Sequence, residues 1–204
     1  MRTNRIHKLF LLPTVLLVLA GGCSGSNDTT NNPEPETGKF NLETAITLGE
    51  LSLVAYEQLK QCIESGKGAI TVPAPFNLDE VIYEGVDSAI NPTCEDDTNV
   101  VPVAFIATEG KNIYLTFRGT ANIADALTDI LDIQVPYTLV SDGGKVSEGF
   151  LNKYMGTDTN PIRTTVFSKL DELVMTGNYD NLYVTGHSMG GALAVTAFPD
   201  LSQN

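Results

Sequence analysis

The chain has 204 residues, 42% of them hydrophobic, with 12 basic against 25 acidic residues and a formal net charge of −13. We expect such a surface to repel nucleic acid and anionic headgroups, so neither class is predicted as a partner. A glycan, a glyceride or another uncharged ester fits this field better than a polyanion.

Residues 1–22 are predicted to be an export signal. Arg2, Arg5 and Lys8 give a positive start, and the apolar stretch 9–20 is shorter than the roughly 20 residues of a membrane-spanning helix. Small residues then lead into Cys23, which resembles the lipobox of bacterial lipoproteins and implies that Cys23 becomes the acylated mature N-terminus. The alternative is an ordinary signal peptide with an incidental cysteine. We therefore expect export to the cell envelope and a lipid anchor, and Ser24 resembles the sorting signal for the outer membrane rather than the inner one.

The next segment, 23–39, is rich in Ser, Asn, Thr, Pro and Gly and is predicted to be a flexible tether. Folding is expected to begin near Phe40, so that 40–204 form one domain. In an exported protein Cys62 and Cys94 remain as an even pair, and a disulfide is predicted between them. Two buried thiols remain the alternative, because the sequence does not place the two Cα atoms within bonding distance.

The first element expected is an amphipathic helix over 40–63, ending at Ser65-Gly66. Gly49 falls on its apolar stripe and leaves open two shorter helices instead of one. That stripe consists of Leu42, Ala45, Ile46, Leu53, Val54, Tyr56 and Leu59. Residues 71–94 are predicted to be loops around a short strand at 81–83, and the acidic cluster 95–97 a solvated turn rather than a cation site.

Strands and helices alternate in the rest of the chain. Two apolar runs, 101–107 and 113–117, flank a Gly- and Asn-containing turn and predict a hairpin. Helical spacing follows at 123–131 and 162–174, and a strand at 182–185 runs into a helix-like segment at 192–197. This order predicts an α/β fold with a mostly parallel sheet.

The pentapeptide 186–190 has the pattern G-x-S-x-G between the last strand and the last helix. A serine exposed at such a sharp turn needs flanking residues without bulk, and Ser188 is the predicted nucleophile. The backbone N–H of Met189 starts the helix and is a candidate donor to an oxyanion. An ordinary serine in a glycine-rich turn is the alternative.

Three blocks in order resemble the class 3 (fungal-type) lipases of the α/β-hydrolase superfamily. Segment 184–194 is similar to that family's elbow, 113–120 to its strand ending in F-R-G-[ST], and 146–150 to its V-H-x-G-F, with Ser147 at the histidine position. Residues 125–130 also resemble its D-W-L-T-D-L helix without the tryptophan. The resemblance implies that Thr120 and Met189 form the oxyanion hole. Thr120 as a plain helix N-cap is the alternative.

The resemblance also leads to expectations for the helix after Thr120 and for Arg118. The helix expected after Thr120 occupies the position of the family's lid, and its apolar stripe suits either a lid or a helix packed permanently on the core. Arg118 is expected to hold the loop by pairing with a carboxylate or with backbone carbonyls.

A base for Ser188 is missing. The chain has two histidines: His7 lies in the leader, and the His187 side chain is expected to point away from Ser188. In α/β-hydrolases the acid and the histidine follow the serine, and Asp200 is too close to it. We therefore expect a fragment whose α/β-hydrolase fold is incomplete at the C-terminus, with the triad Asp and His outside the chain.

The predicted function is hydrolysis of carboxylic esters of lipids by the full-length parent, with this chain inactive on its own. One alternative is a non-catalytic surface lipoprotein that binds lipid or glycan. The other is a phospholipase, thioesterase or acyltransferase of the same fold. The expected partners are a lipid or small ester and, through the anchor, a membrane. No cofactor, metal or obligate protein partner is predicted.

Overall fold

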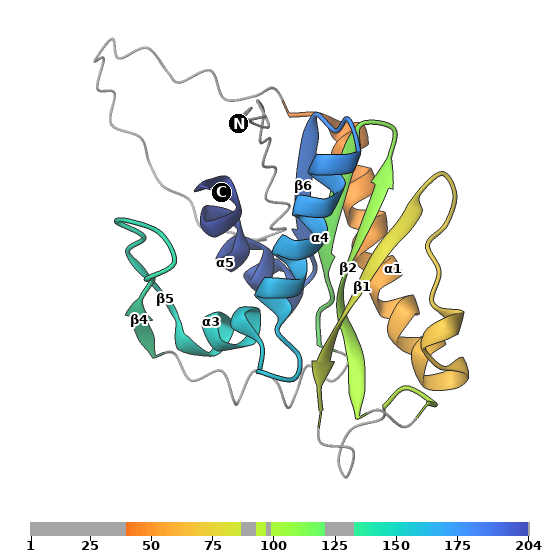
Figure 1. Ribbon diagram of the computed structural model, residues 1–204, viewed down its shortest axis with the longest axis horizontal. Helices are drawn as coiled ribbons and strands as arrows, with labels where there is room; N and C mark the ends of the chain where they lie inside the picture. Colours follow the sequence, from red (N-terminus) through yellow and green to blue (C-terminus); the bar gives the residue numbers. More distant parts are fainter. Residues whose placement is uncertain (1–39, 87–92, 97–98, 121–132, 204) are drawn as a thin grey trace, which may run out of the picture.

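The computed structural model describes residues 40–86, 93–96, 99–120 and 133–203. A four-stranded sheet forms its centre, with helices on both faces (Figure 1). The elements are α1 (Leu42–Ser65), the 3₁₀ turn η1 (Lys67–Ala69), β1 (Asn77–Gly85), β2 (Val100–Glu109), β3 (Asn112–Phe117), β4 (Gln134–Pro136), β5 (Lys145–Ser147), α3 (Glu148–Met155), α4 (Ile162–Thr176), β6 (Asn181–Gly186) and α5 (Met189–Gln203).

The sheet is mixed and has the strand order β1-β2-β3-β6. β1 with β2 and β2 with β3 run antiparallel, and β3 with β6 runs parallel. The expectation of a mostly parallel sheet is therefore wrong for the described residues. The turn between β2 and β3, with Gly110 at φ +56°, is too short for the crossover that a parallel pair needs. The long connection from β3 to β6 allows that pair to be parallel.

Alternate residues of the strands supply two cores. Phe105, Ala107 and Tyr114 pack with Leu48 and Leu51 of α1 on one face of the sheet. On the other face Ala104, Ile106 and Leu115 join the helices α3, α4 and α5 in a larger cluster. This period of two is what strands impose when both faces are covered. The sheet is therefore buried on both sides, and the ends of β3 and β6 carry the loops described below.

The single helix α1 is confirmed, but the face expected to be buried is wrong. Asn41 caps its start by accepting a hydrogen bond from the Thr44 N–H at 3.1 Å, and Gly66 ends it at φ +76°. The buried stripe consists of Leu48, Leu51, Ser52, Ala55, Gln58, Leu59 and Cys62. Leu42, Ile46 and Leu53 are instead exposed, and Gly49 has open space around it. The apolar arc of α1 is wider than the sheet can cover, and spacing alone did not indicate which part of it would be buried.

The other helices and strands agree with those predicted from the sequence, with two kinds of difference. The hairpin β2–β3 and the elements α4, β6 and α5 are confirmed. β1 is longer than the expected strand at 81–83, and β4, β5 and α3 were not predicted. The leader, Cys23, the tether and the expected helix at 123–131 lie outside the described residues. No helix in the described part of the chain is long and apolar enough to cross a membrane.

Candidate active site

Ser188 lies at the turn between β6 and α5 in a conformation that serine rarely adopts. Its φ is +56°, in the left-handed region, and its side chain is exposed. Such a backbone costs about 1–3 kcal/mol and persists only where the surrounding structure imposes it. The predicted elbow is therefore formed, with a strand before the serine and a helix after it.

The glycines around Ser188 are required by close packing of backbone on backbone. A Cβ at Gly186 would overlap the backbone of Gly190, and a Cβ at Gly190 would overlap the carbonyl of Phe117. Any side chain at these positions would push α5 away from β6 and β3. The small residues of the motif thus allow the helix to start directly above the ends of the two parallel strands.

Met189 is the first residue of α5. The next N–H groups are used within the turn: Gly190 donates to the His187 carbonyl at 3.0 Å, and Gly191 donates to the Ser188 carbonyl at 3.0 Å. An N–H at the first helical position has no partner in the helix's own ladder and carries the positive end of the helix dipole. This position suits a donor to an oxyanion beside Ser188.

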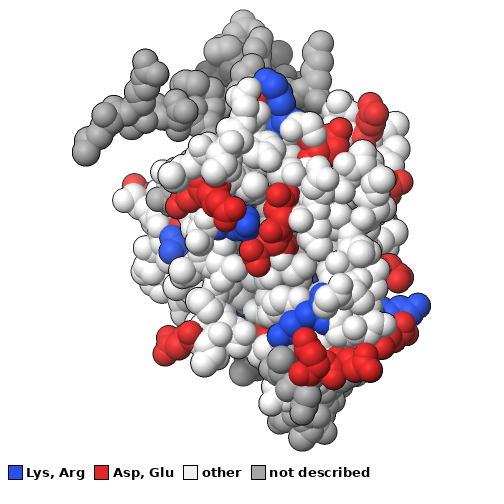
Figure 2. Space-filling view, turned by 45° about the vertical axis from the view of Figure 1, so that its right-hand side comes forward, with Lys and Arg blue, Asp and Glu red and all other residues white. Residues whose placement is uncertain are grey.

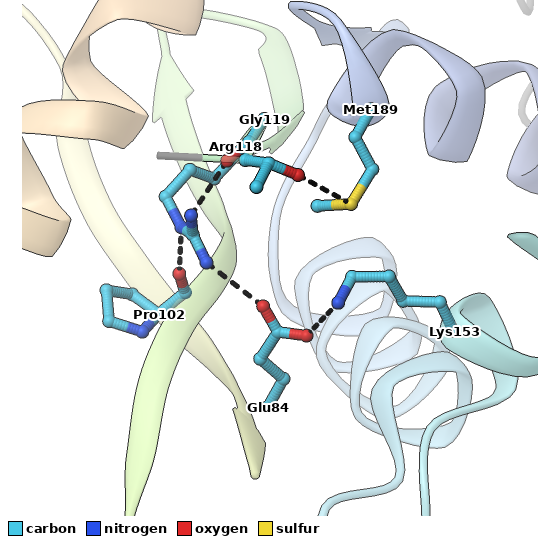
Figure 3. Close-up of polar contacts among 7 residues, drawn as sticks. Glu84, Pro102, Arg118, Gly119, Lys153 and Met189 are labelled. Carbon is cyan, nitrogen blue, oxygen red and sulfur yellow. Dashed lines mark hydrogen bonds and ion pairs between the residues drawn. The ribbon is translucent and has the colours of Figure 1, made fainter. Parts of the chain in front are cut away.

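Thr120 follows β3 and reaches the same place from the neighbouring strand. Its hydroxyl donates to the Met189 sulfur at 3.2 Å, and both side chains are half-buried (Figure 3). The loop after β3 and the start of α5 are therefore in contact. The structure brings Thr120 and Met189 together, as the two sides of an oxyanion hole require.

A buried arginine holds the Thr120 loop. The Arg118 guanidinium donates to the carbonyls of Pro102 at 2.6 Å and Gly119 at 2.7 Å, and to a Glu84 oxygen at 3.0 Å (Figure 3). Lys153 of α3 binds the second oxygen of Glu84. Burial lowers the pKa of Arg118, and the negative charge of Glu84 opposes that shift. Arg118 therefore makes the contacts expected of it, whereas Glu84 was not identified from the sequence.

His187 points to α1. Its Nδ1 lies 3.1 Å from the Tyr56 hydroxyl, with the two rings edge to face at 6.0 Å between centroids. The same hydroxyl occupies the space that a Cβ at Gly119 would need. Burial raises the pKa of Tyr56, against the charge of Arg118. Tyr56 thus contacts both loops of the site. Its place on a helical stripe offered no signal of this.

A groove of about 480 Å³ lies beside α1, and Thr120 and His187 are among the residues that line it. Its wall is mainly apolar, with Lys60 and Glu64 as its charged members. The residues lining it are Leu53, Tyr56, Leu59, Lys60, Ile63, Glu64, Thr120 and His187. Clefts of this size and character bind small apolar molecules.

Asp200 lies on α5 but serves the packing of the helices. It is fully buried and accepts two hydrogen bonds from Arg163, at 2.6 and 2.9 Å, and one from the Tyr154 hydroxyl at 3.0 Å. These contacts tie α5 to α3 and α4.

The candidate disulfide lies away from this chemistry. Cys62 of α1 and Cys94 form a disulfide and pack with Ile70 in a small separate core. Cys23 lies outside the described residues. Within the described ranges, no group of three or more His, Cys, Asp or Glu side chains is arranged to hold a metal ion.

Comparison with known proteins agrees with this geometry. Residues 114–204 match the family model described as lipase (class 3). The lipase of Rhizomucor miehei is 41% identical over 93 residues, or 46% of this chain and 24% of that protein. The lipase of Rhizopus oryzae is 39% identical over the same length, covering 46% and 22%. This chain therefore spans about a quarter of the length of these relatives.

Solved structures show the same fold. The Rhizomucor miehei lipase in its propeptide complex superposes with a TM-score of 0.54 at 24% identity, over 89% of this chain and 57% of that one. Lipase II from Rhizopus niveus gives a TM-score of 0.51 at 25% identity, over 78% and 57%. Residues 114–204 are thus similar to the class 3 lipases, and the fold of the chain is the α/β-hydrolase fold of the fungal lipases.

Proposed function

We propose that the protein hydrolyses carboxylic esters of lipids, with Ser188 as the nucleophile. The observation that carries this proposal is the left-handed backbone of Ser188, at φ +56°, at a turn between a buried strand and a helix. A hydroxyl held exposed in this way can reach an ester carbonyl without rearrangement of the backbone. The match of residues 114–204 to the class 3 lipases supports the reaction class.

The oxyanion that forms on attack is assigned to Thr120 and Met189. Their N–H groups belong to two loops in contact through the Thr120 hydroxyl and the Met189 sulfur. Two preorganised donors on separate loops stabilise the tetrahedral intermediate, and the loss of one such donor typically costs about 3–4 kcal/mol of barrier. Arg118 donates to the carbonyl of one loop, and Tyr56 contacts both loops. These contacts fix the separation of the two donor N–H groups.

The base and its orienting carboxylate are assigned to residues outside 1–204. A serine hydroxyl needs an imidazole that accepts its proton, and the His187 ring is instead directed to the Tyr56 hydroxyl. His7 belongs to the predicted leader. The reaction would begin with proton transfer from Ser188 to this imidazole and attack on the ester carbonyl. The tetrahedral intermediate would then expel the alcohol, which takes the proton from the imidazole, and leave an acyl-serine ester. Water that gives its proton to the imidazole would hydrolyse this ester, releasing the carboxylic acid and restoring the serine hydroxyl.

The substrate would be an uncharged ester with an apolar chain. The groove beside α1 is lined by leucine, isoleucine and tyrosine side chains together with Thr120 and His187. The net charge of −13 disfavours polyanionic substrates. Export and acylation of Cys23 belong to the same proposal, because they would bring the enzyme to lipid.

The test is the activity of the complete reading frame that contains these 204 codons, measured with p-nitrophenyl butyrate. Ser188→Ala should lower kcat at least about 1,000-fold, since removal of a triad serine in a comparable hydrolase lowers it about a millionfold. Ser202→Ala is the matched control, because Ser202 is an exposed serine on α5, the helix that follows Ser188. Equal activity of Ser188→Ala and its parent would overturn the proposal.

Sequencing of the source locus past the codon for Asn204 separates this proposal from a non-catalytic one. An open frame that adds an Asp and then a His supports hydrolysis by Ser188. A stop codon at this point, together with no ester hydrolysis by the purified protein, would favour a lipoprotein that binds lipid or glycan without cleaving it.

A further inference from the structure

A methionine sulfur joins the two loops of the candidate oxyanion hole. The Thr120 hydroxyl donates to the Met189 sulfur at 3.2 Å, from the loop after β3 to the start of α5 (Figure 3). Both residues are half-buried, and Met189 also packs against the larger core cluster. The side chain of Met189, and not only its backbone, therefore contacts the second loop of the site.

The sulfur of a methionine is a weak hydrogen-bond acceptor. It holds the Thr120 hydroxyl in one orientation in the absence of substrate, whereas a charged oxyanion attracts the same hydroxyl more strongly. The thioether of Met189 thus restrains the loop without competing with the transition state. A stronger acceptor at this place would retain the hydroxyl and oppose catalysis.

Oxidation by hydrogen peroxide makes this sulfur a stronger acceptor. The sulfur lone pair attacks one peroxide oxygen, and an S–O bond forms as the O–O bond breaks. The departing hydroxide takes the proton of the new S–OH group and becomes water, so sulfur loses two electrons and the peroxide gains them. The product is a polar sulfoxide that reductases can convert back to the thioether. Because the sulfur of Met189 already lies at hydrogen-bonding distance from Thr120, the new oxygen is added at the contact between the loops.

The charge and the cysteines of the chain favour an uncharged oxidant that acts on a thioether. The net charge is −13, and Figure 2 shows acidic groups separated by uncharged areas on the face it draws. Such a surface repels anionic oxidants but not hydrogen peroxide. Cys62 and Cys94 already form a disulfide, so the reduced sulfur atoms left in the described part of the chain belong to methionines.

We propose that the Met189 sulfur is an oxidative modification site through which hydrogen peroxide reversibly lowers ester hydrolysis by Ser188. The sulfoxide oxygen retains the Thr120 hydroxyl and changes the separation of the two donor N–H groups, so the oxyanion loses stabilisation. The effect on rate rests on the proposed ester hydrolysis. Modification of the sulfur and its coupling to Thr120 do not require catalysis.

The activity test treats the product of the complete reading frame with hydrogen peroxide, and peptide mass spectrometry assigns the sulfoxides. As Met189 is oxidised, kcat for p-nitrophenyl butyrate should fall at least about tenfold with KM within about twofold, since one oxyanion donor is worth about 100- to 1,000-fold. Met189→Leu has a similar volume without sulfur and should stay within about twofold of its own untreated kcat. The matched control carries Met155→Leu and Met175→Leu, removes the methionines that are 40 and 84% exposed, and should lose kcat as the parent does.

Reversal provides a second readout. The two epimer-specific methionine sulfoxide reductases, supplied with dithiothreitol, should restore the kcat of the treated parent. Dithiothreitol alone is the control, because it also acts on disulfides such as Cys62–Cys94, and it should restore nothing.

Methyl NMR of methionine-labelled protein reads the contact without any activity. Met189→Leu identifies the Met189 signal by its disappearance. Thr120→Val removes the hydroxyl and should shift the Met189 methyl signal in both the thioether and the sulfoxide form. The signals of Met155 and Met175 should stay in place.

Three outcomes would overturn the proposal: equal losses of kcat in Met189→Leu and the parent, an unchanged kcat with Met189 fully oxidised, or a folded protein in which peroxide leaves Met189 unmodified. A Met189 methyl signal that does not respond to Thr120→Val would overturn it by removing the contact. If the untreated parent hydrolyses no ester, the esterase proposal fails instead, and the methyl signals and peptide masses alone decide whether the modification site exists.

Discussion

The partly buried Glu84 and the fully buried Asp200 each pair with an arginine, yet they hold different parts of the molecule. The Glu84 side chain is 13% exposed and binds Arg118, which is 6% exposed and also donates to two backbone carbonyls. Asp200 is fully buried, whereas its partner Arg163 is 29% exposed and lies over the Phe167 ring. Both side chains of the Glu84–Arg118 pair are therefore largely shielded from solvent, whereas the arginine of the Asp200–Arg163 pair is partly exposed.

This difference shows that the role of a buried ion pair depends on the segment to which its ends are attached. Arg118 donates to the carbonyl of Gly119, next to Thr120, so the Glu84 pair acts on the loop of the active site. Asp200 joins α5 to α3 and α4, so its pair acts on the packing of helices. We expect the first pair to affect catalysis and the second to affect stability.

The largest effect is expected from Asp200→Asn. It leaves Arg163 and the Tyr154 hydroxyl facing a neutral side chain in a buried site, and loss of one partner of a buried pair costs about 3–5 kcal/mol. Because Arg163 reaches solvent, we expect the free energy of unfolding in urea to fall by about 3 kcal/mol. Asp180→Asn is the control, since it breaks the exposed pair with Lys111 and should cost less than about 0.5 kcal/mol. Equal losses in both variants would contradict this account.

An intermediate effect on stability, with a larger one on activity, is expected from Glu84→Gln. The change leaves the Arg118 charge buried with weaker acceptors and should lower the free energy of unfolding by about 2 kcal/mol. In the complete reading frame, at a temperature where both variants are folded, kcat should fall about tenfold because the Thr120 loop is displaced. Asp200→Asn should keep kcat within about twofold there. Equal kcat losses in the two variants would erase the proposed distinction between the ion pairs.

The smallest effect is expected at high pH, and the tyrosines beside Asp200 contribute to it. Burial and then the charge of Asp200 raise the pKa of Tyr137 to about 12, and the same causes raise the pKa of Tyr154 above its ordinary value. Above pH 10 the folded state then binds more protons than the unfolded state, so the free energy of unfolding falls as pH rises from about 10 to 12.

Tyr137→Phe should flatten that decline by about 1 kcal/mol in urea unfolding series between pH 9 and 12. It also removes the 2.7 Å hydrogen bond to the Thr196 carbonyl, which should cost about 1 kcal/mol at neutral pH. Ser202→Ala, which removes no titratable group, is the comparison variant and should keep the parent slope. An unchanged slope in Tyr137→Phe would remove Tyr137 from the explanation.

The turn of the candidate site was predicted correctly because it is a local structure, in which a strand, two glycines and a helix adjacent in the chain surround Ser188. The role of Ser188 as nucleophile stays a prediction. Arg118 was predicted to pair with a carboxylate or carbonyls, but its partner Glu84 lies 34 residues earlier in a segment read mostly as loops. Tyr56 contacts His187 across 131 residues, so no pattern near either residue pointed to the other.

The sequence by itself determined α1, the β2–β3 hairpin, α4, β6 and α5, but not β4, β5, α3 or most of β1, and it led to the proposed reaction class. Apolar period, turn glycines and the elbow pattern allow these predictions because they are short-range properties. Only the tertiary structure decided which side of α1 is buried: the helix has a wider apolar arc than one sheet face can cover, and the sheet takes Leu48, Leu51 and Ala55. It also decided that the sheet is mixed and that Glu84, Arg118 and Lys153 meet. These contacts depend on how distant segments pack, and packing is set by the whole domain rather than by any one stretch of chain.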